Sequence, residues 1–175
     1  MRSSRLLIAA TATGALVLGS AAPATADPTT ANVTITGGVL GFTVPAAAGS
    51  LGTRPNTVAG GVISGQLGEI QVTDARSAAA GSAWVVSVIS TAFTPSAGPT
   101  IPASAVGYVA GTIVKTGTAT YVANNPAALT GVSAAVTASG ITGDNSATWN
   151  PTINIAVPGG MAAGTYTGVI THSLA

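Results

Sequence analysis

The sequence contains no cysteine and a single histidine, His172. A chain without cysteine forms no disulfides and no thiolate metal sites, so its stability must come from its core and its strand hydrogen bonds. Serine- or cysteine-type catalysis needs a base beside the nucleophile, and one histidine is available for that role. We therefore expect a protein that is not an enzyme and that uses no cofactor and no metal.

Charged residues are also scarce, at 5% of the chain against a usual ~25%. Beyond residue 26 three basic side chains (Arg54, Arg76 and Lys115) stand against four acidic ones, which gives a net charge of −1. Three basic side chains are too few to neutralise a run of phosphates. The composition therefore excludes nucleic acid and an anionic membrane surface as partners.

The acidic residues are too dispersed for most carboxylate chemistry. Asp144 stands alone beside Asn145, whereas calcium sites use several carboxylates. Glu69 and Asp74 are close in sequence, but the pattern places Glu69 on the outward face of a strand and Asp74 at the start of a loop. We expect both to be solvated, with Asp74 forming at most a weak local ion pair with Arg76.

The first residues are typical of a secretory signal peptide. Arg2 and Arg5 precede an apolar stretch over 6–22, and residues 24–26 have the small-residue pattern of a cleavage site. We predict a signal peptide over 1–26, cut between Ala26 and Asp27, with an uncleaved membrane anchor as the alternative. Residues 27–175 then form a single secreted domain that has no membrane contact after cleavage.

Short stretches that alternate apolar and polar residues follow one another between Gly, Pro and Asn turns. No window has helical spacing. The pattern predicts an all-β, antiparallel β-sandwich (Ig-like) of about ten short strands, with a closed barrel as the alternative. Gly37 and Gly38 are typical of a hairpin turn. The predicted strands cover 32–36, 39–44, 61–64, 68–73, 84–90, 106–110, 112–115, 118–123, 133–138, 152–157 and 164–174.

The final predicted strand has a clear two-residue period. Tyr166, Gly168, Ile170, His172 and Leu174 share one face, and the opposite face carries Thr, Val and Ser. This pattern is typical of a half-buried strand that closes a sheet. On this basis His172 is expected to be a packed histidine, at the rim of the sandwich or inside it.

Two sequence blocks resemble those of WxL-domain surface proteins. The first is LGEIQVTDAR at 67–76, followed by a small-residue loop and AWVVSV at 83–88. It resembles the family's strand ending in V-x-D-x-R and the tryptophan-containing strand after it. The second block, PGGMAAGTYTGVITHSL at 158–174, is similar to the closing block P-x-G-x-x-A-G-x-Y-x-A-x-L-T-W-x-L. His172 stands where that block has tryptophan.

The resemblance implies an exported Gram-positive protein that attaches non-covalently to the cell wall, with peptidoglycan as its ligand. The Ala-, Gly- and Thr-rich composition is typical of a high-GC Gram-positive bacterium. Carried over by position, the ligand-binding residues are Trp84, Val86, His172 and Leu174. From its pattern alone, Trp84 is otherwise expected to be buried between sheets.

The residues also support a second function. Thr-rich strands with few charges lack the Lys and Glu that usually protect sheet edges. The alternative to wall-polymer binding is thus a secreted structural or adhesive subunit that self-associates through its edges. The expected partners are a cell-wall polymer, another surface protein or a second copy of the chain.

Overall fold

The computed structural model describes residues 30–175. The predicted signal peptide and its cleavage site between Ala26 and Asp27 lie outside the described residues. Residues Ile35–Ala175 form one compact unit. The other unit ends at Thr34, and its described residues, 30–34, are exposed and have no regular secondary structure.

The prediction of an all-β antiparallel sandwich is confirmed. Helical structure within residues 30–175 is limited to one 3₁₀ turn, η1 (Ala103–Ala105). The described chain has ten strands: β1 (Leu40–Thr43), β2 (Gly61–Gln66), β3 (Ile70–Ser90), β4 (Thr94–Pro95), β5 (Val106–Val109), β6 (Val114–Ala123), β7 (Ser133–Trp149), β8 (Thr152–Val157), β9 (Tyr166–Thr167) and β10 (Ile170–Leu174).

The largest sheet has the order β1-β3-β7-β6, and β10 also pairs with β3. β1 pairs with the first residues of β3 and β10 with its last residues, so both lie along one edge of this long strand. A second sheet has the order β2-β8-β5, and β4 pairs with β9. The last strand, β10, therefore joins a sheet as predicted. The single strand predicted over 164–174 is interrupted, however, since β9 pairs with β4 and β10 with β3.

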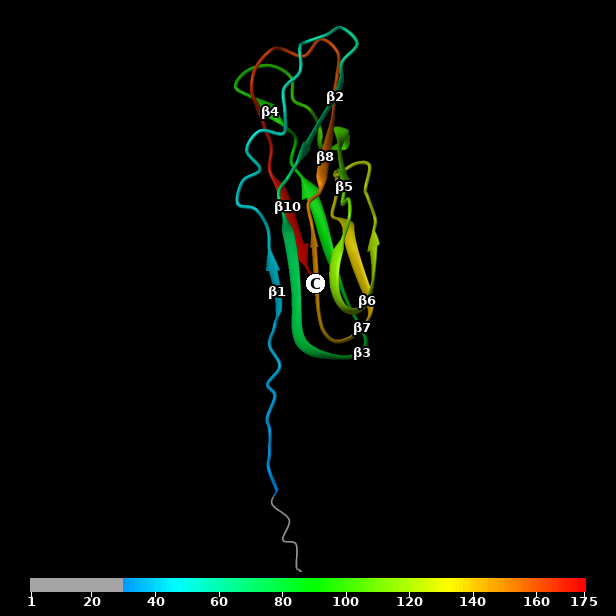
Figure 1. The fold of residues 1–175 in the computed structure, drawn as a ribbon. Coiled ribbons are helices and arrows are strands. Elements are labelled where there is room, and N and C mark those ends of the chain that lie inside the picture. Colours follow the sequence, from blue (N-terminus) through cyan, green and yellow to red (C-terminus); the bar gives the residue numbers. More distant parts are fainter. Residues whose placement is uncertain (1–29) are drawn as a thin grey trace, which may run out of the picture. The chain divides into compact units, whose positions relative to one another are not determined.

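β3 is continuous where the sequence predicted two strands separated by a loop. Figure 1 shows β3 running down, bending at its lower end and returning upward. Its register with β7 shifts repeatedly between Asp74 and Trp84, and Ser77 (φ 52°) and Gly81 (φ 89°) have left-handed backbone there. Small residues and left-handed φ values allow a strand to bend without losing its partner. The two halves of β3 thereby contribute to both layers of the sandwich.

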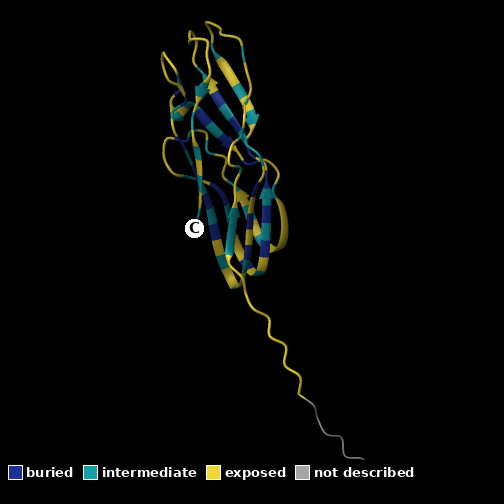
Figure 2. Cartoon of the chain, turned by 90° about the vertical axis from the view of Figure 1, so that its left-hand side faces the viewer, coloured by how far each residue is buried: buried dark blue, intermediate teal, exposed yellow. Residues whose placement is uncertain are grey.

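The core lies between these halves. Alternate residues of the first half and of the second are buried, and Figure 2 shows this alternation along the strands. Tyr108 of the second sheet belongs to the same core, and the Trp149 indole at the end of β7 donates a 2.9 Å hydrogen bond to the Tyr108 hydroxyl. The main aliphatic and aromatic members are Ile70, Val72, Trp84, Val86, Val88, Phe93, Ile101, Val106, Tyr108, Leu129, Ile141, Trp149 and Ile153.

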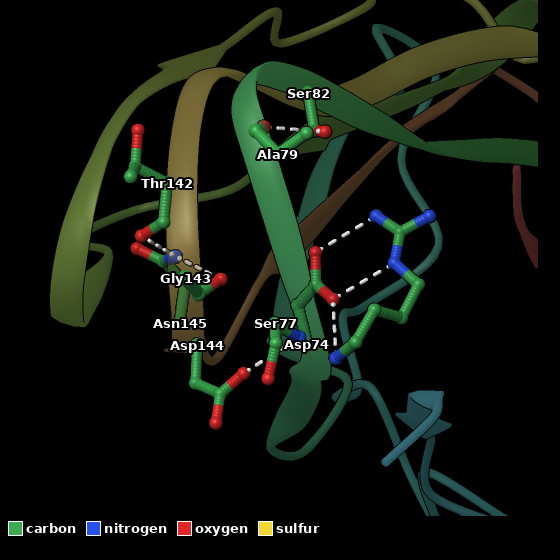
Figure 3. Close-up of polar contacts among 9 residues, drawn as sticks. Asp74, Ser77, Ala79, Ser82, Thr142, Gly143, Asp144 and Asn145 are labelled. Carbon is green, nitrogen blue, oxygen red and sulfur yellow. Dashed lines mark hydrogen bonds and ion pairs between the residues drawn. The ribbon is translucent and has the colours of Figure 1, made fainter. Parts of the chain in front are cut away.

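The bend of β3 holds a compact set of polar contacts (Figure 3). The expectation that Asp74 is solvated was wrong, since it lies within β3 and is buried. The Arg76 guanidinium donates two 2.8 Å hydrogen bonds to the Asp74 carboxylate. The positive charge of Arg76 thereby compensates the buried negative charge of Asp74. These bonds lower the pKa of Asp74 below its ordinary value, against the opposing effect of burial. Glu69 is exposed, as expected.

The predicted strand over 32–36 and the hairpin at Gly37 and Gly38 were both wrong. Val33 and Ile35 are 88% and 89% exposed, and residues 32–36 pair with no described strand. Instead the Gly38 amide donates to the carbonyl of Ala75, so the two glycines run alongside β3. β1 thus takes β3 as its partner, and the strand-like segment before it has none in the described chain.

Candidate functional site

A cavity of about 790 Å³ opens within the unit Ile35–Ala175. Its wall comes from the loop over 44–57, from residues of β8 and from the chain over 161–172. This volume is in the range of small-molecule and cofactor sites, ~300–1,000 Å³. The final strand borders the cavity, so the part of the sequence with the second resemblance block also lines this cavity.

Part of the lining is apolar and fixed. Phe93 and Ile101 are buried, and their backbones exchange two hydrogen bonds of 2.8 and 2.9 Å. The Phe93 ring lies so close to Gly168 that a Cβ there would be 2.7 Å from it. A side chain at position 168 would therefore displace the ring. Ile155 and Met161 complete this buried part of the lining.

The polar part of the lining is held by short-range contacts. The Tyr166 hydroxyl donates a 2.9 Å hydrogen bond to the carbonyl of Ala162. The Arg54 guanidinium donates to the carbonyl of Gly60 and, at 3.3 Å, to the Thr57 hydroxyl. No acidic residue lies among the described lining residues. The cavity therefore combines aromatic and hydroxyl groups with one positive charge.

His172 lies on β10 directly opposite Val88 of β3 and lines the cavity. Its ring centroid is 5.7 Å from that of Tyr108, which connects the cavity wall to the core. Burial lowers the pKa of His172 to about 4, so the ring is neutral at neutral pH. Its Nε2 atom is buried and has no hydrogen-bond partner among residues 30–175. A neutral ring with a free nitrogen can donate or accept one hydrogen bond.

The structure brings the two resembling motifs together. Val86 lies directly opposite Leu174, and Trp84 and Val86 share the inward face of β3 with Val88. Trp84 and Val86 are buried, whereas Leu174 is half-buried. Of the four residues expected to bind ligand, His172 alone lines the cavity. A ligand role for the other three stays a prediction that the cavity does not support.

Trp84 has a packing role in this arrangement. Its ring lies 5.6 Å from that of Tyr121 in a tilted contact, and 2% of the residue is exposed. Its indole nitrogen has no hydrogen-bond partner in the described chain. Trp84 is therefore buried, as its sequence pattern predicted, and does not offer an exposed face to a ligand.

Among the lining residues that the sequence did not predict are Arg54, Phe93 and Tyr166. Tyr166 shares the predicted inward face of the last strand with His172, so a signal for it was present. Arg54 lies in a loop, and Phe93 forms an isolated bridge with Ile101. At such positions the alternation of apolar and polar residues does not predict which side chains are in contact. Their meeting depends on contacts between residues far apart in the sequence.

No family model matches the chain, and neither a curated protein nor a solved structure matches it. Among residues 30–175 no three His, Asp or Glu side chains are grouped as a metal site would require. No helix in the same part of the chain has the length and apolar character needed to cross a membrane.

Proposed function

We propose that this chain is an exported, non-catalytic cell-surface protein of WxL-like type that binds a cell-wall polymer non-covalently. Its ligand would be peptidoglycan, held in the cavity beside His172. The observation that carries the proposal is the position of the cavity. The final strand supplies His172, and the segment before it supplies Tyr166, both within the closing block that resembles the family.

The chemistry of the lining suits such a polymer. Sugar rings have apolar faces that pack on aromatic side chains, and the half-buried Tyr166 offers such a surface. Peptidoglycan also carries carboxylates, and Arg54 is the charged residue on the wall of the cavity. Since no acidic lining residue accompanies Arg54, a carboxylate would meet no like charge there.

The non-catalytic part of the proposal rests on the state of the titratable groups. His172 is a poor base, because burial lowers its pKa to about 4. The Asp74 carboxylate is already paired with Arg76 and lies on β3, away from the cavity lining. Neither group is placed to activate a nucleophile.

Sedimentation with isolated cell walls tests the proposal. The protein should pellet with walls, and Arg54→Ala should weaken this several-fold through loss of the cavity's positive charge. Lys115→Ala is the matched control, since it also removes one basic side chain but lies on β6 outside the cavity. Unchanged sedimentation of Arg54→Ala, or wild-type protein that stays in the supernatant, would contradict the proposal.

Export itself is tested by fractionating the producing cells. The proposal expects the chain in the wall fraction and in the medium, with a mass that lacks residues 1–26. A full-length chain in the membrane fraction would instead support the uncleaved anchor.

A further inference from the structure

The segment over 32–36 has the pattern of a strand but no strand partner. Asn32, Thr34 and Thr36 alternate with Val33 and Ile35, and all five residues are exposed. β-branched residues in strict alternation are suited to a pleated, half-buried strand. An exposed segment of this kind gains buried apolar surface and backbone hydrogen bonds when it joins a sheet.

β6 offers an edge that such a segment could join. It ends the order β1-β3-β7-β6, and among the described strands it pairs with β7 alone. Its side-chain hydrogen bonds from Thr118 and Tyr121 also run to β7. Val114 and Val122 are 68% and 49% exposed, and Lys115 is its single charged residue. This edge lacks most of the protection that edge strands usually carry.

The β5 edge of the second sheet is covered by neighbouring chain. The Tyr108 amide donates a 2.9 Å hydrogen bond to the Pro126 carbonyl outside the sheet, and the Ala110 amide donates one of the same length to the Asn125 side chain. At the other edge, β2 has six residues against the ten of β6, and Leu51 packs on its face at Gly65. β6 is therefore the longer edge that a segment could join.

We propose that residues 32–36 of one copy add as an antiparallel strand to the outer edge of β6 in a second copy. The acceptor stretch is 120–124, where β6 and the residue after it keep a regular register with β7. It is as long as the donor segment, and neither stretch contains a charged residue.

One copy of the chain cannot supply both the donor segment 32–36 and the β6 edge that accepts it. Gly37 lies against the Arg76 carbonyl at the β3 edge, on the side of the sheet away from β6. The outer edge of β6 is three strand spacings away, ~14 Å at 4.8 Å per strand. Crossing that width would use about four of the five residues, at ~3.3 Å each. The acceptor is therefore a second copy.

Donor and acceptor are different surfaces, so the contact is of the head-to-tail type. Each copy that donates its segment still has a free β6 edge. Such an interface extends into chains or closes into rings. It does not involve the cavity lining, so wall binding and assembly can fail independently.

The absence of native cysteine allows a direct test. Single-cysteine variants at each of positions 32 to 36 are mixed with Val122→Cys under mild oxidation. A paired strand has side chains that alternate between faces, so the yield of mixed disulfide dimer should alternate with period two along 32–36. The matched acceptor control is Val109→Cys on β5, where the valine is 39% exposed but the edge is covered by residues 125 and 126. It should give a several-fold lower yield.

Light scattering supplies the second measurement. The average mass of the wild-type protein should rise with concentration, and a variant that lacks residues 30–36 should stay monomeric. A flat yield along 32–36, or equal yields with Val109→Cys and Val122→Cys, would overturn the proposal. So would a wild-type protein that stays monomeric at high concentration. Val122→Cys dimers that exceed the mixed dimers would show β6-to-β6 pairing instead, and would also overturn it.

Discussion

The Trp149 indole donates a 2.9 Å hydrogen bond to the Tyr108 hydroxyl, and both side chains are buried. Trp149 ends β7 and Tyr108 lies on β5, so this bond joins the largest sheet to the second sheet. The Tyr108 ring in turn lies 5.7 Å from the His172 ring at the cavity. The core and the candidate site are thus in direct contact through one tyrosine.

Tyr108→Phe should lower the free energy of unfolding by about 1–3 kcal/mol, because it leaves the buried Trp149 N–H without an acceptor. Burial raises the pKa of Tyr108 to about 12, so the hydroxyl remains protonated over the usual working range. Urea denaturation measures the change. Tyr166→Phe is the control, since its hydrogen bond is exposed, and it should cost less than about 0.5 kcal/mol. Equal losses would contradict the assigned role.

The two tryptophans should respond differently to replacement by phenylalanine. Trp149→Phe removes a buried hydrogen-bond donor, whereas Trp84→Phe removes an indole N–H that has no partner in the described chain. Trp149→Phe should therefore destabilise the protein by about 1 kcal/mol more than Trp84→Phe in urea denaturation. Trp84→Phe should also keep its sedimentation with walls, because Trp84 does not line the cavity. A folded Trp84→Phe protein that loses wall binding would restore Trp84 as a ligand residue.

The Asp74–Arg76 pair predicts a loss of stability in acid. The hydrogen bonds from Arg76 lower the folded-state pKa of Asp74 below 3.8, while the unfolded chain keeps an ordinary value. The unfolded state therefore binds the proton first, and the stabilisation is present above that value and lost as pH falls through the folded pKa. Arg76→Ala should flatten the dependence of the urea midpoint on pH below 4. Lys115→Ala should leave the pH dependence of the urea midpoint unchanged. If Arg76→Ala showed a pH dependence as steep as that of the wild type, the role given to the Asp74–Arg76 pair would be refuted.

His172 predicts a separate effect at higher pH. Burial lowers its folded pKa to about 4, against an ordinary 6.5. The unfolded state then takes up the proton first, so stability should fall as pH decreases from about 6.5 to about 4. His172 is the sole histidine, so its Hε1 resonance can be followed by NMR without assignment. The midpoint should lie near 4 in the native protein and near 6.5 in urea. A native midpoint near 6.5 would contradict the buried, neutral ring.

Local pattern predicted the strand content well because the inward face of each strand carries its own period of two. Ile170, His172 and Leu174 are half-buried while Thr171 and Ser173 are exposed, as predicted. The same alternation led to a wrong strand prediction over 32–36. Alternation shows that a segment is able to pair as a strand, but it does not show whether a partner strand lies beside it. The prediction of a loop over 74–83 was wrong, since β3 is continuous there. Small residues are typical of loops, but they also allow a strand to bend sharply.

The candidate site was less predictable than the fold. The resemblance selected His172, which lines the cavity, and Trp84, which does not. A cavity forms where residues distant in the sequence meet, and no periodicity reports that meeting. The prediction that Asp74 is solvated was wrong for a similar reason. The sequence showed its partner Arg76 but not that the bend of β3 would bury the carboxylate.

The central claim is that the cavity beside His172 binds a cell-wall polymer. The most direct measurement is an NMR titration of the isotope-labelled protein with soluble peptidoglycan fragments. The account predicts concentration-dependent shifts at Arg54, Tyr166 and His172, which line the cavity, with little change on β6. Shifts confined to β6, or spectra that stay unchanged at high fragment concentration, would contradict it.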